Sequence, residues 1–178
     1  MLQRASRFWA KVELILAAAL AAAISGLILL NVVTRAMGAA IYWVDEAAIY
    51  AMVWMTCLAG SAALHHRSAI AVTVLPEMAP MLARFCARLA DVAVLVFALL
   101  LLWVTWRWFM PLEFARAGFD PRTFQGTTFN FIYAEPTTTI GIPKVWVWLV
   151  MPIFAAGCTL HAVANLLRPL PDSQERPA

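Results

Sequence analysis

Four long apolar runs alternate with polar segments along the chain, over residues 14–33, 47–64, 92–108 and 145–167. A transmembrane helix needs about 20 mostly apolar residues, so each run predicts one membrane-spanning helix. The first run follows Arg4, Arg7 and Lys11, in the manner of a signal peptide. Because its apolar core is longer than the usual ~7–15 residues, we interpret it as a retained anchor. The pattern predicts an all-α integral membrane protein with four transmembrane helices.

The segment between the second and third runs has a helical periodicity of its own. From Pro76 to Leu89, apolar side chains recur at the spacing of one helix face, while Arg84 and Arg88 share another face. This pattern is typical of an amphipathic helix that lies in the membrane interface, with its arginines toward anionic head groups. A plain extension of the third span would show the same pattern, so both interpretations stay open.

The connector after the third run, residues 109–144, is long for a loop between two helices. Pro111 should kink or end the third helix, and Gly118 should stop the helix that follows. A short hairpin that turns at Gln125 and Gly126 is the expectation for the next stretch. Four aromatic residues lie there: Phe124, Phe129, Phe131 and Tyr133. They predict either a surface that docks a protein or side chains that fold back onto the membrane complex.

Four spans place both chain ends on one side of the membrane, and the basic residues indicate which side. Eight of the 13 would lie with the termini: Arg4, Arg7, Lys11, Arg67, Arg84, Arg88, Arg168 and Arg176. The other five would lie opposite: Arg35, Arg107, Arg116, Arg122 and Lys144. Because loops rich in Lys and Arg stay in the cytoplasm, this bias favours cytoplasmic termini and a periplasmic location for residues 109–144.

The composition agrees with a membrane location and narrows the classes of function. Hydrophobic residues make up 63% of the 178 residues and charged residues 13%, against about 45–50% and about 25% in soluble domains. We therefore expect a single membrane domain over residues 1–178. The cysteines Cys57, Cys86 and Cys158 lack the spacing of a disulfide framework or a zinc site. No dense run of Lys and Arg suggests a nucleic-acid partner.

The spans lack the groups that a solute carrier needs. A carrier places polar or ionisable side chains at the bilayer midplane, usually on broken helices of a repeated architecture. None of the four predicted spans has an Asp, Glu, Lys or Arg near its centre, and the sequence shows no repeat. We expect no catalytic residue, metal site or cofactor site, and we predict that transport requires a partner. Small residues spaced four apart, such as Ala18, Ala22 and Gly26, would pack within the bundle or against another protein.

The three histidines support an alternative function. His65 and His66 end the second run, and His161 lies about one turn from the end of the fourth. Histidines on facing helices ligate haem in membrane cytochromes, so a haem- or quinone-linked anchor of an oxidoreductase is the alternative. The structural interpretation is that His65 and His66 extend to the membrane interface, while His161, on one face with Cys158 and Asn165, hydrogen-bonds a neighbouring helix.

Two adjacent acids, Asp45 and Glu46, precede the second apolar run, although an acid costs about 2.5–3.5 kcal/mol at mid-bilayer. At a helix N-terminus they would meet four unpaired N–H groups and the positive end of the helix dipole. Asp45 is expected to be the N-cap and Glu46 a first-turn acid, with Arg35 as the nearest cation. Capping alone does not explain why two acids occur where one would suffice.

The segment NVVTRAMGAAIYWVDEAAIYAMVWMTCLAGSAAL resembles the hallmark region of the small membrane subunit of tripartite ATP-independent periplasmic (TRAP) transporters, the DctQ-like family. The matching positions are Asn31, Arg35, Trp43, Asp45, Glu46, Trp54 and Gly60. A later segment is similar to the family's entry into its fourth helix, at Ile142, Pro143, Trp146 and Pro152. The chain departs from the family at Ala69, where a histidine is usual, and in its longer third loop.

The resemblance implies a division of labour among three proteins. A periplasmic solute-binding protein captures the solute, usually a carboxylate, and a large multi-span membrane subunit carries it inward. An ion gradient drives that step, usually one of sodium bound to the large subunit. The small subunit is implied to be a non-enzymatic scaffold, surrounded by lipid in the bacterial inner membrane. The seven matching positions are then candidates for structural or subunit-interface roles.

Overall fold

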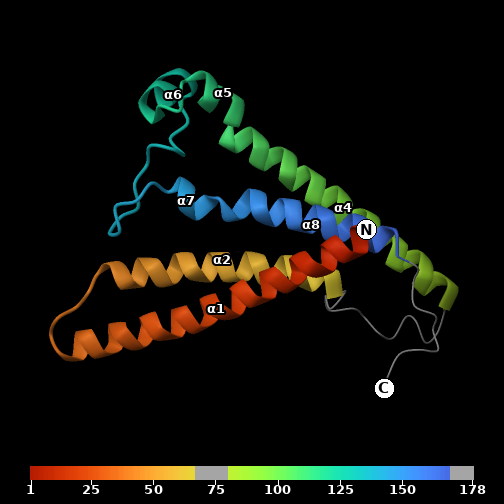
Figure 1. Cartoon of the computed structure of the whole chain (residues 1–178), viewed down its shortest axis with the longest axis horizontal. Coiled ribbons are helices and arrows are strands. Elements are labelled where there is room, and N and C mark those ends of the chain that lie inside the picture. The colour runs from red at the N-terminus through yellow and green to blue at the C-terminus, as the bar shows by residue number, and fades with distance from the viewer. Residues whose placement is uncertain (67–79, 169–178) are drawn as a thin grey trace.

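The computed structural model describes residues 1–66 and 80–168, and every regular element in this part is a helix (Figure 1). The elements are α1 (Leu2–Ala36), α2 (Trp43–His66), α4 (Pro80–Phe109), α5 (Pro111–Arg116), α6 (Pro121–Thr128), α7 (Val145–Trp148) and α8 (Val150–Leu166). Extended pairing in these residues is limited to one isolated bridge, between Pro136 and Pro143. The predicted all-α fold is confirmed.

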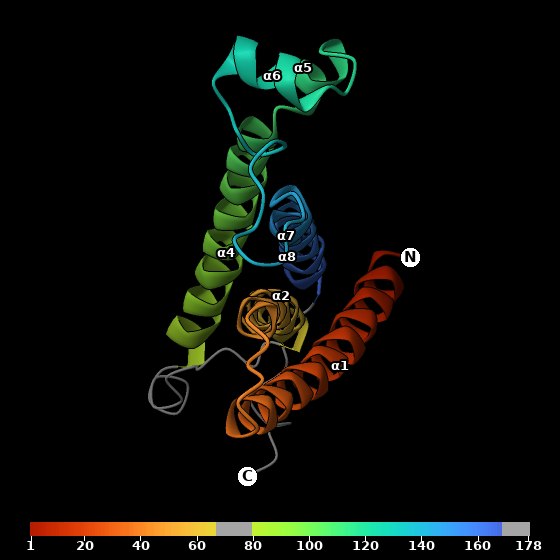
Figure 2. The same ribbon diagram turned by 90° about the vertical axis from the view of Figure 1, so that its left-hand side faces the viewer.

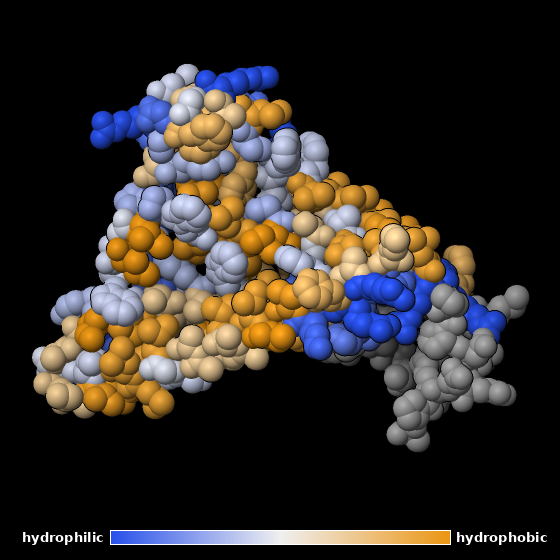
Figure 3. Space-filling view, viewed as in Figure 1, coloured by the Kyte–Doolittle hydropathy of each residue, from blue (hydrophilic) through white to orange (hydrophobic). Residues whose placement is uncertain are grey.

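Four helical segments are long and apolar enough to cross a membrane: Leu2–Ala36, Trp43–His66, Arg84–Arg116 and Val145–Leu166. They coincide with the four predicted spans. The first has 35 residues, and at 1.5 Å per residue it is about 52 Å long, against about 30 Å of hydrocarbon. The helix therefore begins well before the predicted run. In Figure 3, hydrophilic colour gathers over α5 and α6 and near the N-terminus, and apolar colour covers much of the surface between them.

Helix α8 is the centre of the arrangement, because it packs against α1, α2 and α4, while α1 also packs along α2. The helices converge near the N-terminus and spread apart toward the turn between α1 and α2 (Figure 1). Seen from the spread side, they form a curved row (Figure 2). We call the end with Ser6, His65 and His161 the histidine end, and the end with the α1–α2 turn the hairpin end.

The two halves of α1 differ in how they pack. The buried residues of this helix, Ser6, Ala10, Glu13 and Ala17, lie on one face at spacings of four, three and four, and all belong to the first half. Beyond Ala17 no residue of α1 is buried. The small residues Ala18, Ala22 and Gly26 are exposed, so this stripe does not pack within the described part of the chain.

A glycine-dependent turn closes the hairpin between α1 and α2. Gly38, with φ +72°, donates to the carbonyl of Arg35, and Ala39 donates to that of Thr34. These two bonds define a Schellman motif, which requires a left-handed residue just after the helix. Gly38 supplies that conformation without steric cost.

The predicted interfacial helix between the second and third spans is described only in part. Residues 76–79 lie outside the described residues, and residues 80–89 are the first turns of α4, without a break before the span. This continuity is what the extension interpretation expects. Arg88 donates to the carbonyls of Leu166 and Arg168 at 2.8 and 3.0 Å. Its guanidinium thus satisfies carbonyls at the end of α8.

The break after the third span occurs where the sequence predicts it. Met110 has a left-handed backbone with φ 45°, and Pro111 is the first residue of α5. Proline has no N–H to donate and disfavours a helical conformation in the residue before it, so α4 ends at Phe109. Gly118, with φ +65°, follows the end of α5 as expected.

Residues 121–128 form α6, so the expected hairpin at Gln125 and Gly126 is wrong. The physical reason is the cap before it. Asp120 accepts hydrogen bonds from the backbone N–H and the hydroxyl of Thr123, at 2.9 and 2.6 Å, and starts a helix there. The bond from the Thr123 hydroxyl holds the pKa of Asp120 below its usual range.

Helices α5 and α6 enclose a small aromatic core, made of Phe109, Phe114, Phe124, Ile132 and Tyr133. The rings of Phe114 and Tyr133 stack with centroids 3.7 Å apart. The Tyr133 hydroxyl donates to the Phe109 carbonyl at 2.7 Å, and burial raises its pKa. Phe129 and Phe131 remain 83% and 50% exposed. Two of the four predicted aromatics therefore fold inward and two face outward.

Candidate functional site

The acid pair at the hairpin end lies in the first turn of α2. That helix begins at Trp43, so Asp45 and Glu46 are its third and fourth residues. The expectation that Asp45 is the N-cap is wrong, because the helix starts two residues earlier. The placement at the positive end of the helix dipole agrees with the expectation.

Asp45 faces α1. The guanidinium of Arg35 donates to Asp45 Oδ2 at 2.6 Å, and the Asn31 amide donates to Asp45 Oδ1. Arg35 Nε in turn donates to Asn31 Oδ1 at 2.9 Å. The three side chains form a closed set of hydrogen bonds between the end of α1 and the start of α2. We call them the hairpin triad.

Glu46 faces the opposite way and binds a loop that precedes α7. Its carboxylate accepts from the backbone N–H groups of Thr138, Thr139 and Ile140, at 2.8, 2.7 and 3.0 Å. The Thr139 hydroxyl and the Tyr50 hydroxyl complete the set at 2.6 and 2.7 Å. Three successive backbone amides around one carboxylate form a typical anion-binding nest.

The nest is formed by a short two-sided loop. Pro136 pairs with Pro143, Thr137 donates to the carbonyl of Ile142 at 2.8 Å, and Gly141 turns the chain with φ +79°. The N–H groups at the tip of this loop therefore point out of the loop, toward α2. The structure thus explains two acids in sequence: Asp45 ties α2 to α1, and Glu46 ties α2 to the segment that leads into α8.

The remaining family positions lie elsewhere along α2. Trp54 donates its indole N–H to the carbonyl of Val147 at 2.9 Å. That carbonyl lies in the single turn of α7, just before α8 begins at Val150. Trp43 is 46% exposed. At Gly60, an added Cβ would be 3.7 Å from the Phe154 ring, an ordinary contact, so close packing does not demand glycine there.

A second polar cluster, at the histidine end, was not expected from the sequence. The hydroxyl of Ser6 lies 2.7 Å from His65 Nδ1 and 2.8 Å from His161 Nδ1. The other ring nitrogen of His161 lies 3.0 Å from Glu13 Oε2. Ser6, Glu13 and His161 are each 0% exposed. We call these four residues, which join α1, α2 and α8, the buried relay.

Gly157 makes room for this cluster. A Cβ at this position would lie 2.5 Å from Ser61 Oγ, 2.6 Å from Glu13 Oε1 and 3.0 Å from Trp9 Nε1. Real Cβ atoms do not approach other atoms so closely, so only glycine fits against these side chains. The sequence does carry a signal for this cluster. Ser6 and Glu13 have the spacing of one face of a first helix, and Gly157 and His161 have the spacing of one face of the last helix. It was missed because the predicted first span began one residue after Glu13.

The histidine geometry bears on the alternative function. Both ring nitrogens of His161 are already hydrogen-bonded, as the structural interpretation expected. Asn165 also donates to a neighbouring helix, at 2.7 Å to the Leu64 carbonyl. Haem ligation by His161 would break contacts of the buried relay, so the arrangement gives no support to a haem anchor.

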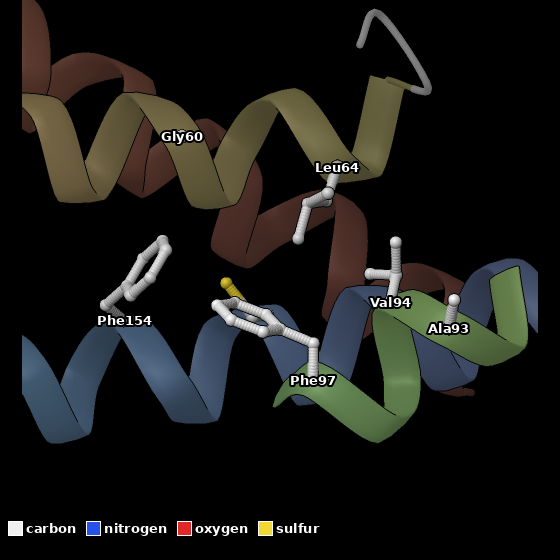
Figure 4. A pocket seen from close by; sticks show the side chains of 7 residues that line it. Gly60, Leu64, Ala93, Val94, Phe97 and Phe154 are labelled. Atoms are coloured by element: carbon white, nitrogen blue, oxygen red, sulfur yellow. The ribbon is translucent and has the colours of Figure 1, made fainter. Parts of the chain in front are cut away.

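One apolar groove opens between α2, α4 and α8 (Figure 4). It measures about 370 Å³, and its lining residues are Gly60, Leu64, Ala93, Val94, Phe97, Phe154 and Cys158. No charged side chain lines it, so it has no group that would recognise a carboxylate or an inorganic ion. The groove suits an apolar occupant of the membrane.

These features define a class: a helical membrane protein with four helices long and apolar enough to cross the bilayer. The comparison with protein families gives the family. A model of the DctQ component of tripartite ATP-independent periplasmic transporters matches residues 24–172. The match covers most of the chain, so the chain belongs to this family. It is a small permease component of a TRAP transporter. No curated protein and no solved structure matches the chain.

Proposed function

We propose that this chain is an accessory subunit that braces a large membrane subunit, which itself carries the solute. The observation that carries the proposal is the family match over residues 24–172. The apolar groove between α2, α4 and α8 supports it, because a carrier needs polar groups at its solute site.

Two exposed apolar faces are available for the large subunit or for lipid. On α4, Val96, Leu100 and Trp103 are 51%, 56% and 63% exposed and share one face. On α1, the second half exposes Ala18 and Ala22, which permit close approach of another helix. Helices in a curved row leave both faces of the row open to such contacts (Figure 2).

The proposed orientation in the membrane rests on the distribution of Lys and Arg, and the proposed roles of the partner proteins rest on the family. The histidine end faces the cytoplasm and the hairpin end, with α5 and α6, faces the periplasm of the bacterial inner membrane. A periplasmic binding protein delivers a carboxylate solute, and the large subunit moves it with sodium. This small subunit binds neither sodium nor solute.

Reconstitution tests the division of labour. Proteoliposomes that contain this chain alone should accumulate no solute, while those with both membrane subunits and the binding protein should accumulate it. The large subunit should co-purify with this chain from detergent. Uptake by the small subunit alone would overturn the proposal.

A second role, docking of the binding protein, is favoured by the cap of α5 and α6. Phe119 and Phe129 are 68% and 83% exposed, and both have left-handed backbones, with φ 60° and 55°. Such conformations are uncommon outside glycine and cluster at functional surfaces. Exposed aromatics are enriched in protein interfaces.

Paired substitutions separate docking from folding of the cap. Phe129→Ser should reduce uptake while the membrane complex stays intact, because the ring faces outward. Phe124→Ala, at a fully buried position, should disorder the cap and serve as the structural comparison. Normal uptake by the Phe129→Ser and Phe119→Ser variants would exclude docking at this surface.

A further inference from the structure

We propose that Glu13 and His161 form a buried proton-binding site, loaded from the histidine end through Ser6 and His65. The ligand of this site is a single proton. The proposal is independent of the accessory function, since it concerns contacts within this chain alone.

The argument begins with the hydrogens around Ser6. Its hydroxyl lies within hydrogen-bond distance of two Nδ1 atoms, those of His65 and His161. A hydroxyl has one hydrogen to donate, so it donates to one Nδ1 and accepts from the other. One of the two Nδ1 atoms must therefore carry a hydrogen. Either arrangement gives the Ser6 hydroxyl and both Nδ1 atoms a hydrogen bond. The contact with Ser6 alone therefore does not decide which histidine carries the hydrogen.

The buried carboxylate decides between the two arrangements. If His65 carries the Nδ1 hydrogen, His161 is neutral, and Glu13 is either a buried anion without a charged partner or an acid whose O–H on Oε1 has no acceptor. If His161 carries it, with a second hydrogen toward Glu13 at 3.0 Å, the two side chains form a neutral pair. An uncompensated charge at a fully buried position is strongly disfavoured. The geometry therefore favours one proton held between Glu13 and His161.

The second oxygen of Glu13 is buried without a hydrogen bond to the described part of the chain. Trp9 Nε1 and Glu13 Oε1 are both buried, and neither has a hydrogen-bond partner in the structure. Together with the Ser61 hydroxyl they surround the free face of Gly157, each within 3.0 Å of its missing Cβ position. Without a hydrogen-bond donor on this oxygen, a Glu13 anion has only His161 to compensate its charge, which agrees with one proton held between the two side chains.

The route from solvent is short and balanced. A proton from water binds His65 Nε2, the Nδ1 hydrogen of His65 passes to Ser6 Oγ, and the former Ser6 hydrogen passes to His161 Nδ1. One proton enters, His65 is neutral before and after, and His161 becomes the cation beside Glu13. His65 is half-buried and His66 beside it is exposed, with ring centroids 5.1 Å apart.

The other ionisable groups around the relay come from all three packed helices and the end of α8. Arg7, His66, His161 and Arg168 act on His65 electrostatically, and Glu13 and Cys57 act on Cys158. Burial of His65 and the two nearby arginines oppose a lasting positive charge there. Within the buried relay, the added positive charge is therefore most stable beside the Glu13 carboxylate.

Nitrogen NMR of the full chain in lipid nanodiscs tests the site directly. The chain has three histidines, so the signals lost in His66→Gln and in His65→Gln assign those two rings, and the His161 signals are then read in the unaltered chain. At about pH 8, where an exposed histidine is neutral, we expect a hydrogen on His161 Nδ1. A bare Nδ1 at His161 would overturn the proposal.

Two further variants separate the site from its route. Glu13→Gln removes the anion, so His161 should carry a hydrogen on only one ring nitrogen at the same pH, whereas the control Glu113→Gln on α5 should leave both the Nδ1 hydrogen and the one shared with Glu13 in place. Hydrogens on both ring nitrogens of His161 in the Glu13→Gln variant would contradict the site. Ser6→Ala should slow exchange of the Nδ1 hydrogen with solvent by about a hundredfold. The matched control is Ser25→Ala on the same helix, and an unchanged rate in Ser6→Ala would contradict the route.

Discussion

The two ends of this molecule both join helices through an acid, yet the surroundings of the two acids are opposite. At the hairpin end, the side chains of the Arg35–Asp45 pair are 59% and 48% exposed. At the histidine end, the Glu13–His161 pair is fully buried. Exposed pairs contribute little to stability because water and salt screen them, whereas a broken buried pair leaves a charge that nothing compensates.

This difference assigns different tasks to the two ends. The buried relay holds α1, α2 and α8 of the chain itself together. The hairpin triad should stabilise the isolated chain little, and we propose that it acts where another subunit covers it. The family match begins at residue 24. It therefore includes the triad and leaves out Ser6 and Glu13.

The largest effect should come from removing one partner of the buried pair. His161→Ala leaves Glu13 buried without a partner and should cost about 3–5 kcal/mol of unfolding free energy. Thermal or denaturant unfolding in detergent would measure it, with the exposed His66→Ala as the control. The double substitution Glu13→Leu with His161→Leu should recover much of the loss. Equal stability of His161→Ala and His66→Ala would show that the relay does not hold the helices.

Filling the space beside Glu13 should have the next largest effect. Gly157→Ala places a Cβ 2.5 Å from Ser61 Oγ and 2.6 Å from Glu13 Oε1, and overpacking of this kind costs about 1–3 kcal/mol. Gly60→Ala is the matched control, because its Cβ meets only Phe154 at 3.7 Å. The family pattern singles out Gly60 and the structure singles out Gly157. A larger loss in Gly60→Ala would favour the family pattern.

The sequence predicted the four spans because about 20 consecutive apolar residues have few other interpretations in a chain this hydrophobic. It also predicted the break at Pro111, where the missing N–H acts locally. It did not predict α6, because the Asp120 cap outweighed the turn preference of Gly126. The buried relay depends on which faces of α1, α2 and α8 meet, and a hydropathy pattern carries no information about that pairing. The sequence shows two adjacent acids, Asp45 and Glu46. It does not show that they bind different partners, because those partners are brought close only by the fold.

Loss of the Glu46 contacts should loosen one loop and leave the helices in place. Glu46→Gln removes the charge that three successive amides bind, so hydrogen exchange at Thr139 and Ile140 should become faster. Asp45→Asn is the neighbouring control, since the Asp45 carboxylate accepts its hydrogen bonds from Arg35 and Asn31 on α1. Hydrogen exchange with mass spectrometry resolves the peptide. Faster exchange in Asp45→Asn alone would show that the nest is not held by Glu46.

The smallest effect on the isolated chain should come from Arg35→Ala. An exposed ion pair contributes about 0.2–1 kcal/mol, so the unfolding midpoint of the purified subunit should hardly move. Assembly with the large subunit should suffer more, because a partner that covers the hairpin end would bury Asp45 without its cation. Co-purification yield and subunit stability, measured on the same variant, test this contrast. If yield is normal and only solute affinity falls, the triad belongs to a solute path, and the hairpin end is more than a brace.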